Sequence, residues 1–352
     1  MREPIAPRRT TNMLLIIAAL IVILAGLKAG QSLLVPFLLA VFIATIASTP
    51  IQWLTRHRVP NWLSVLLVAI AVVLVLSGLG LVVLQTFREY QAEQAVYIEK
   101  VRELINNVAN FGDRLGLPIS EDTVTTLFNT DEVVNFAGAA IRRIGQVLSN
   151  FFLILLTVIF ILAEATEWPK KLRTFLSDRE MEIEWLNQFG STLNRYIAIK
   201  STTSLLTGVL VTLLLTVMQV DFAIMWGLLA FLLNYIPNIG SFIAATPGVL
   251  VAMVQLGYGP AFIVLIGYVV INVGIGAGIE PRFLGRTLGL STLVVFLSLV
   301  FWGWMFGPVG MLLSVPLTMT AKIAFGTSES TEWIAHLLEP GVPRNSVQQT
   351  KQ

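Results

Sequence analysis

Phe222 to Ile279 reads FAIMWGLLAFLLNYIPNIGSFIAATPGVLVAMVQLGYGPAFIVLIGYVVINVGIGAGI and carries no charged residue over its 58 positions. As one continuous helix with a rise of about 1.5 Å per residue, it would be about 87 Å long. That length is close to three crossings of a hydrocarbon core of about 30 Å. We therefore predict that this stretch lies in a membrane.

Helix breakers interrupt this apolar stretch at Asn234 to Gly240 (NYIPNIG), at Pro247-Gly248 and at Gly257 to Pro260 (GYGP). Backbone polar groups that a break frees at membrane depth must be satisfied by protein or by a water-filled cavity. We expect interrupted helices here. The sequence leaves open whether residues 222–257 cross the membrane fully or re-enter.

The stretch ends in Glu280 to Arg286 (EPRFLGR), which places a carboxylate beside two guanidinium groups. An unpaired charge at the end of a membrane segment is costly, so Glu280 should have a partner. We predict Arg282 or Arg286 as that partner. Two roles remain open for Glu280, a structural clamp at the membrane boundary and a group for proton coupling or substrate contact.

The composition supports a membrane protein and excludes several function classes. Hydrophobic residues make up 55% of the 352 positions and charged residues 12%, which lies outside the range of soluble domains. The formal net charge of +2 favours neither nucleic acid nor an acidic partner. The chain has no cysteine and two histidines, so we expect no metal site. No catalytic set or cofactor motif is evident, and we expect no enzyme activity.

Residues 1–87 form the first region, with predicted spans at Met13–Leu27, Leu33–Pro50 and Trp62–Thr86. The chain begins with a basic flank that includes Arg8 and Arg9, and such a flank predicts a cytoplasmic amino terminus. A signal peptide is the alternative, but no small-residue cleavage site is evident.

Residues 88–146 form a second, charged region, which the three preceding crossings place outside the cytoplasm. Apolar residues recur there at helical spacing, namely Tyr97, Val101, Leu104, Ile105, Val108 and Phe111. This pattern predicts a helical segment with one apolar face. The face either packs on its own subunit or pairs between subunits as a collar, which would make the protein a homo-oligomer.

Residues 147–325 form the carboxyl-terminal membrane region, and residues 326–352 a cytoplasmic tail. The region begins with a span at Val147–Ala163, and a second span follows at Thr202–Val220. Between them, the apolar stripe of residues 181–200 predicts a cytoplasmic amphipathic helix along the membrane surface. That helix either packs at the interface or acts as a gate.

A second uncharged run, from Thr287 to Ala321, covers 35 residues. At about 52 Å as a helix, it is too long for one crossing of about 30 Å and too short for two. We predict that it bends or re-enters, at Trp302-Gly303-Trp304, Gly307-Pro308 or Pro316.

Six polar residues are candidates for a substrate pathway or for coupling: Asn234, Asn238, Asn272, Glu280, Arg282 and Arg286. Each asparagine could instead cap a broken helix. A second group is predicted to break or pack helices: Pro237, Gly240, Gly274, Gly278, Pro281, Gly303, Gly307, Pro308 and Pro316. Gly274 and Gly278 form a small-xxx-small pair, as do Gly303 and Gly307, and we predict close helix packing at both pairs. The Gly274 run lacks the third glycine and the acidic residue of a dinucleotide site.

Several motifs together resemble one family of transporters. They are Val35 to Phe37, Phe222 to Gly240 with its NYIPNIG, Glu280 to Arg282, Gly285-Arg286, Leu288 to Ser291, Phe301 to Trp304, and Gly307 to Thr318. The chain resembles the autoinducer-2 exporter (AI-2E) family over most of its length. The resemblance implies an inner-membrane transporter that exports the quorum-sensing signal autoinducer-2, with effects on biofilm formation. Some members of the family are linked instead to sodium or proton antiport.

We expect an all-α, polytopic inner-membrane protein with about eight transmembrane helices. Interrupted or re-entrant helices occupy its carboxyl-terminal half, and a helical segment lies outside the cytoplasm. The expected function is export of autoinducer-2 or a similar small polar solute. Two alternatives remain: a monovalent cation/proton antiporter driven by H+ or Na+, and an oligomeric membrane scaffold without transport. The expected partners are membrane lipid, the small signal molecule and further copies of the chain.

Overall fold

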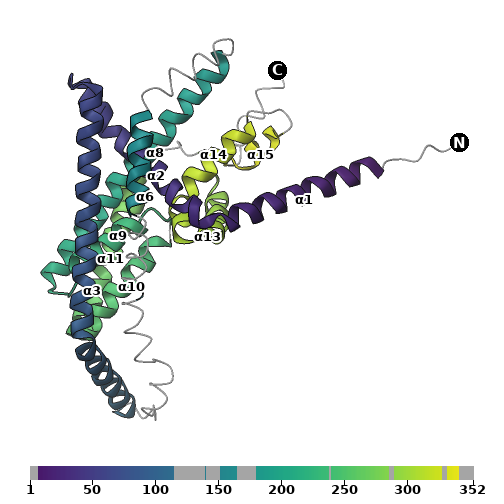
Figure 1. Cartoon of the computed structure of the whole chain (residues 1–352). Helices are drawn as coiled ribbons and strands as arrows, with labels where there is room; N and C mark the ends of the chain where they lie inside the picture. Colours follow the sequence, from purple (N-terminus) through teal and green to yellow (C-terminus); the bar gives the residue numbers. More distant parts are fainter. Residues whose placement is uncertain are drawn as a thin grey trace, which may run out of the picture.

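Figure 1 shows the computed structural model of the chain, which consists of helices and connecting segments. The structure describes residues 7–114, 139, 151–164, 180–237, 239–284, 289–326 and 331–340. Within these ranges no β-strand is present. The predicted division into four regions stays a prediction.

The helices follow one another in this order: α1 (Pro7–Ala29), α2 (Gln31–Arg56), α3 (Asn61–Arg114), α6 (Phe151–Glu164), α8 (Glu180–Val217), α9 (Ala223–Leu233), α10 (Gly240–Leu256), α11 (Tyr258–Val273), the π-helix η1 (Gly274–Ile279), α12 (Glu280–Leu284), α13 (Thr292–Leu312), α14 (Ser314–Gly326) and α15 (Glu332–Leu337). In the described residues, five helical segments are long and apolar enough to cross a membrane: Gln31–Arg56, Asn61–Glu93, Gly190–Val217, Tyr258–Ile279 and Thr292–Leu312. Shorter apolar helices lie at Ile17–Ala29, Phe152–Glu164, Ala223–Leu233 and Gly240–Leu256. The predicted all-α, polytopic membrane fold is confirmed.

Helix α3 is a single helix of 54 residues that combines a membrane span with a projecting extension. It runs along one side of the molecule and reaches beyond the other membrane helices (Figure 1). Tyr97 and Val101, in the first part of this extension, are buried in the chain's own core. These two residues of the predicted apolar face therefore pack on their own subunit. The side chains from Leu104 to Phe111 lie outside the described residues.

Helix α8 differs from the predicted surface helix in the second half of residues 181–200. The chain from Glu180 to Val217 forms one continuous helix, and its candidate membrane span already begins at Gly190. Tyr196 and Ile197 are buried in the core instead of lying at an interface. Tyr196 of the predicted stripe therefore packs inside the bundle, whereas the side chains of residues 181–189 lie outside the described residues.

Residues 221–255, which we name the first hairpin, consist of α9, α10 and the turn between them. The side chain of Gln255 at the end of α10 donates hydrogen bonds of 3.0 Å to the Asp221 carboxylate and to the Gln219 carbonyl. The hairpin therefore returns to the place where it began. At its tip, Asn234 contacts Ser204, which lies in the middle of the span 190–217. The tip of the first hairpin thus lies about halfway along that span, and the hairpin returns to its starting side. Of the two alternatives that the sequence left open for this stretch, the structure shows re-entry.

Glycines allow the first hairpin to lie very close to α8. A Cβ atom on Gly208 would come within 2.9 Å of the Gly227 carbonyl oxygen, and one on Gly227 within 2.8 Å of the Gly208 carbonyl oxygen. Backbones this close leave no room for a side chain, which is the usual role of small residues between membrane helices. Gly240 has a similar role at the tip, because its Cβ would overlap the Leu233 carbonyl group.

Residues 289–322, which we name the second hairpin, double back in the same way. Lys322 at the end of this segment donates a hydrogen bond of 2.8 Å to the Gly289 carbonyl at its beginning. Gly307 has φ 66° and ψ −149°, a conformation open to glycine, and it interrupts α13 just before Pro308. Trp302 then donates to Thr318 across the hairpin at 2.9 Å. The predicted bend of this run is confirmed at Gly307-Pro308.

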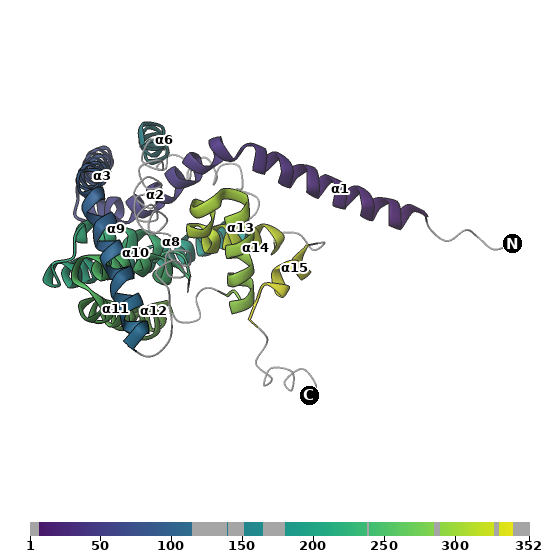
Figure 2. The ribbon, with the colours of Figure 1, turned by 90° about the horizontal axis from the view of Figure 1, so that it is seen from below.

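The two hairpins occupy different parts of the molecule. The first lies with α8 and α11 beside α3, and the second lies with α15 on the side from which α1 projects (Figures 1 and 2). Lys28 at the end of α1 donates hydrogen bonds to the Trp304 and Met305 carbonyls near the tip of the second hairpin. At the hairpin's base, the Ser291 amide donates to the Leu338 carbonyl at 3.0 Å and joins α15 to it.

Candidate functional site

A buried ion pair joins α8 to the start of α12. The Lys200 ammonium nitrogen lies 2.7 Å from Oε1 of Glu280, and the two side chains are 6% and 18% exposed. The predicted pairing of Glu280 with Arg282 is therefore wrong, because Lys200 forms the ion pair and Arg282 is exposed. Arg286 lies outside the described residues. The error has a physical reason, since a buried carboxylate gains most from a charge that is also removed from water.

The local backbone explains how Glu280 reaches α8. Residues 274–279 (GIGAGI) form a π-helix, η1, between α11 and α12. A π-helix takes more residues per turn than an α-helix and is often found next to functional sites. It rotates the residues that follow it relative to α11. Pro281 follows directly as the second residue of α12.

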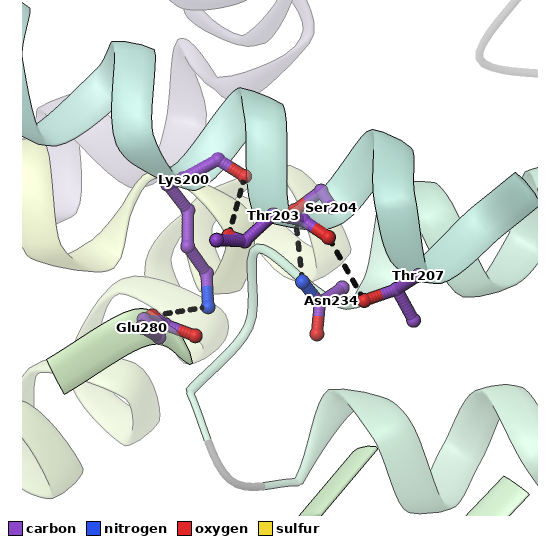
Figure 3. Close-up of polar contacts among 6 residues, drawn as sticks. All are labelled: Lys200, Thr203, Ser204, Thr207, Asn234 and Glu280. Atoms are coloured by element: carbon purple, nitrogen blue, oxygen red, sulfur yellow. Dashed lines mark hydrogen bonds and ion pairs between the residues drawn. The ribbon is translucent and has the colours of Figure 1, made fainter. Parts of the chain in front are cut away.

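Polar side chains continue along α8 from the ion pair towards the tip of the first hairpin (Figure 3). Lys200, Thr203, Ser204 and Thr207 are all buried, and their spacing of three and four residues places them on one face of the helix. Thr203 and Thr207 donate to backbone carbonyls one turn earlier, at 3.1 and 2.9 Å. This polar face lies within a candidate membrane span.

Asn234, at the tip of the first hairpin, adds its side chain to this polar face. Its amide nitrogen donates to Ser204 Oγ at 3.0 Å, and its side-chain oxygen points away from α8 (Figure 3). The next residue, Tyr235, donates to Ser201 Oγ at 2.8 Å. Its ring packs edge-on against Phe42 of α2, with a centroid distance of 5.4 Å. The tip of the first hairpin is therefore held against α8 by two hydroxyl groups.

We name Lys200, Thr203, Ser204, Thr207, Asn234 and Glu280 the buried polar cluster. It retains unused hydrogen-bonding capacity. An ammonium group has three donors, and within the described residues the Lys200 ammonium donates a hydrogen bond to Glu280 alone. The side-chain oxygen of Asn234 accepts no hydrogen bond from the described residues. The cluster thus presents both donors and acceptors inside a largely apolar bundle.

The other predicted pathway residues take different places. Asn272 donates to the Tyr268 carbonyl one turn earlier in α11, at 2.8 Å, and makes no hydrogen bond to the described part of the buried polar cluster. Asn238 lies outside the described residues. Of the predicted set, the structure places Asn234 and Glu280 in one cluster, because Asn234 bonds to Ser204 of α8 and Glu280 to Lys200 of the same helix.

The predicted packing glycines divide into two groups. The prediction for Gly274 and Gly278 is wrong within this chain, because no described atom would lie within 4 Å of a Cβ on either residue. Gly303 does pack closely, since its Cβ would lie 2.8 Å from the Met311 side chain. Gly307 instead allows the backbone of α13 to turn, because its φ is positive. Pro316 is buried in the first turn of α14, and Pro237 lies in the turn before α10.

Sequence reasoning missed Lys200 and the hydroxyl residues of α8. The available signal was the spacing of three and four residues between Lys200, Thr203, Ser204 and Thr207. The predicted surface helix ended at Lys200, so this spacing was divided between two predicted elements. No local pattern in residues 180–217 indicates that α8 continues without a break. In the described part of the chain, no group of three or more His, Asp or Glu side chains is placed to hold a metal ion.

Comparison with known proteins finds relatives that match nearly the whole chain. The sequence model described as AI-2E family transporter matches residues 17–330. A protein of Haemophilus influenzae is 44% identical over 331 residues, covering 92% of this chain and 95% of the relative. AI-2 transport protein TqsA of Escherichia coli K12 is 36% identical over 342 residues, covering 96% and 98%. YhhT of the same organism is 35% identical over 345 residues, covering 98% and 99%. These matches span nearly the whole chain, and the protein belongs to the AI-2E family of membrane transporters.

Proposed function

We propose that this transporter exports autoinducer-2 or a similar small, neutral, polar solute across the bacterial inner membrane. The observation that supports this most directly is the buried polar cluster, because it offers hydrogen bonds at membrane depth where the re-entrant first hairpin meets α8. A polyhydroxylated solute needs both donors and acceptors, which Lys200, Glu280 and Asn234 supply. The name of TqsA supports the substrate class.

The orientation is part of the proposal. The basic amino-terminal flank supports a cytoplasmic amino terminus. The extension of α3 and the base of the first hairpin then face away from the cytoplasm. The base of the second hairpin, with α15, faces the cytoplasm. Assembly as a homo-oligomer stays a prediction.

The function is tested by efflux of autoinducer-2 from sealed liposomes that contain the purified protein. We expect efflux that depends on the protein, and a large reduction, of tenfold or more, in Glu280→Gln and in Lys200→Met. Glu332→Gln is the matched control, since it removes an exposed carboxylate on α15 and should leave efflux unchanged. Protein-containing liposomes that retain the solute as well as empty ones would refute the export function.

The second candidate is antiport of a monovalent cation against protons. The specific observation in its favour is that Glu280, at the end of the span 258–279, is a carboxylate paired with an ammonium group inside the bundle, and ionisable groups in such places mark proton relays in transporters. The same liposomes distinguish the candidates. Efflux without any ion gradient favours a facilitator, whereas proton movement driven by a sodium gradient, without efflux of the solute, favours the antiporter.

A further inference from the structure

A second polar network, far from the buried polar cluster along α8, surrounds Asp221 at the base of the first hairpin. Tyr97 of α3 donates to Oδ2 of Asp221 at 2.5 Å, and Gln255 of α10 donates to Oδ1 at 3.0 Å. The Asp221 amide donates to the Gln255 side chain at 2.9 Å, and the Trp226 ring nitrogen donates to the Asp221 carbonyl at 3.0 Å. Asp221 is thus bound by three elements at once.

The turn that carries Asp221 is held in an unfavourable conformation. Gln219 and Phe222 both have left-handed backbones, with φ of 58° and 60°, although neither is glycine. Such residues persist only where the surroundings over-determine them, and they gather at switches and ligand clamps. Gln255 and Trp226 supply contacts inside the first hairpin that hold this turn.

The contact with α3 differs in kind from those inside the hairpin. Tyr97 brings the hydroxyl, while the Tyr90, Tyr97 and Phe222 rings pack together with centroid distances of 6.2 to 6.4 Å. Ring packing tolerates sliding, whereas a hydrogen bond to a carboxylate has a defined direction and length. The Tyr97 hydroxyl therefore defines how the extension of α3 sits on the hairpin base.

We propose that the hydrogen bond between Tyr97 and Asp221 is a latch that closes the base of the first hairpin. A solute that has passed the buried polar cluster leaves beside this base, and it does so when the extension of α3 moves away and the bond breaks. Tyr97 and Asp221 are positioning residues, which act on the solute through the hairpin. This role in release rests on the proposed function, whereas the opening of the latch does not.

The opening is measured by labelling a buried position. The chain contains no cysteine, so Val101→Cys adds a single thiol, at a residue that is 5% exposed on the same face of α3. In lipid nanodiscs, Tyr97→Phe should raise the rate of labelling by a water-soluble maleimide about tenfold, because a hydrogen bond to a charged group is lost while the ring remains. Glu99→Gln, which breaks an exposed ion pair on the same helix, should leave the rate unchanged.

Transport provides the second readout. Tyr97→Phe should release solute from liposomes faster than the parent protein. In the double variant Tyr90→Cys/Phe222→Cys, a short bifunctional thiol reagent should stop release, since the parent rings lie 6.4 Å apart. Each single-cysteine variant, treated in the same way, should continue to transport.

The outcomes separate the two proposals. An unchanged labelling rate in Tyr97→Phe, in protein that elutes as the parent does, overturns the latch. Faster labelling with unchanged release shows that the latch opens but does not control exit, which also overturns the proposal. If the parent itself releases no solute, the export function fails, and the labelling rate alone then decides whether Tyr97 holds the hairpin closed.

Discussion

Lys200 is the buried cation on which the stability of the site depends most directly. Replacing it by methionine leaves the Glu280 carboxylate without its partner, which we expect to destabilise the protein by about 3 kcal/mol. The measurement is the free energy of unfolding in detergent, followed by tryptophan fluorescence. The double variant Lys200→Met/Glu280→Gln should recover a large part of the loss, because it buries no unpaired charge. Equal losses in the single and double variants would show that the ion pair does not hold the helices together.

Gly240 and Gly274 give a matched pair of alanine substitutions at the same scale. A Cβ on Gly240 would overlap the Leu233 carbonyl, whereas one on Gly274 would meet no described atom within 4 Å. We expect Gly240→Ala to destabilise by about 3 kcal/mol through overpacking of backbone. Gly274→Ala should change stability by less than about 1 kcal/mol, because alanine also favours a helix. Thermal unfolding of both variants checks this, and equal shifts would contradict the close crossing at the first hairpin's tip.

At the scale of elements, α15 is fastened to the base of the second hairpin by a charge. Lys322 lies 3.0 Å from Glu339 and lowers the pKa of that carboxyl below its ordinary value of 4.5, with a smaller contribution from His336. A lowered pKa in the docked state means that the contact is present above pH 4.5 and is lost as the pH falls through the lowered value. Docking of α15 should therefore persist at neutral pH and weaken in acid.

Hydrogen exchange in α15, measured between pH 7 and pH 3 and corrected for intrinsic rates, tests this dependence. Glu339→Gln should remove the acid-dependent part of the protection. Glu332→Gln, which removes a carboxylate of α15 that pairs with His336, should keep it. A protection that is independent of pH in the parent would show that the backbone bond from Ser291 to Leu338 holds α15 without help from the charge.

At the scale of the whole molecule, both hairpins return to the side on which they begin. α11 and η1 then cross between the bases of the two hairpins. In a chain without cysteine, Gln219→Cys and Tyr258→Cys should react with an impermeant thiol reagent from one side of the membrane. Arg282→Cys and Glu332→Cys should react from the other side. Labelling of Gln219→Cys and Tyr258→Cys from opposite sides would mean that the first hairpin crosses fully.

The sequence by itself determined the membrane class, the all-α fold and several of the places where helices break. These follow from local properties, since the absence of charge over 58 residues indicates a membrane segment, and Pro237, Gly307 and Pro308 lie where the chain turns. The break predicted at Pro247-Gly248 is wrong, because α10 continues through both residues. The sequence also identified Glu280 as a charge at the end of a membrane segment that needs a partner, and Asn234 as a candidate for the substrate pathway.

Only the tertiary structure decided which partners they have and which way the broken helices run. Lys200 and Glu280 are 80 residues apart in the sequence. Their contact depends on a continuous α8 and on the rotation that the π-helix η1 introduces before Glu280. Gly208 and Gly227 bring the first hairpin against α8, and neither glycine carries a local signal of that crossing. Local patterns fix the period and the breaks of a helix, whereas its direction after a break is set by close packing between distant segments.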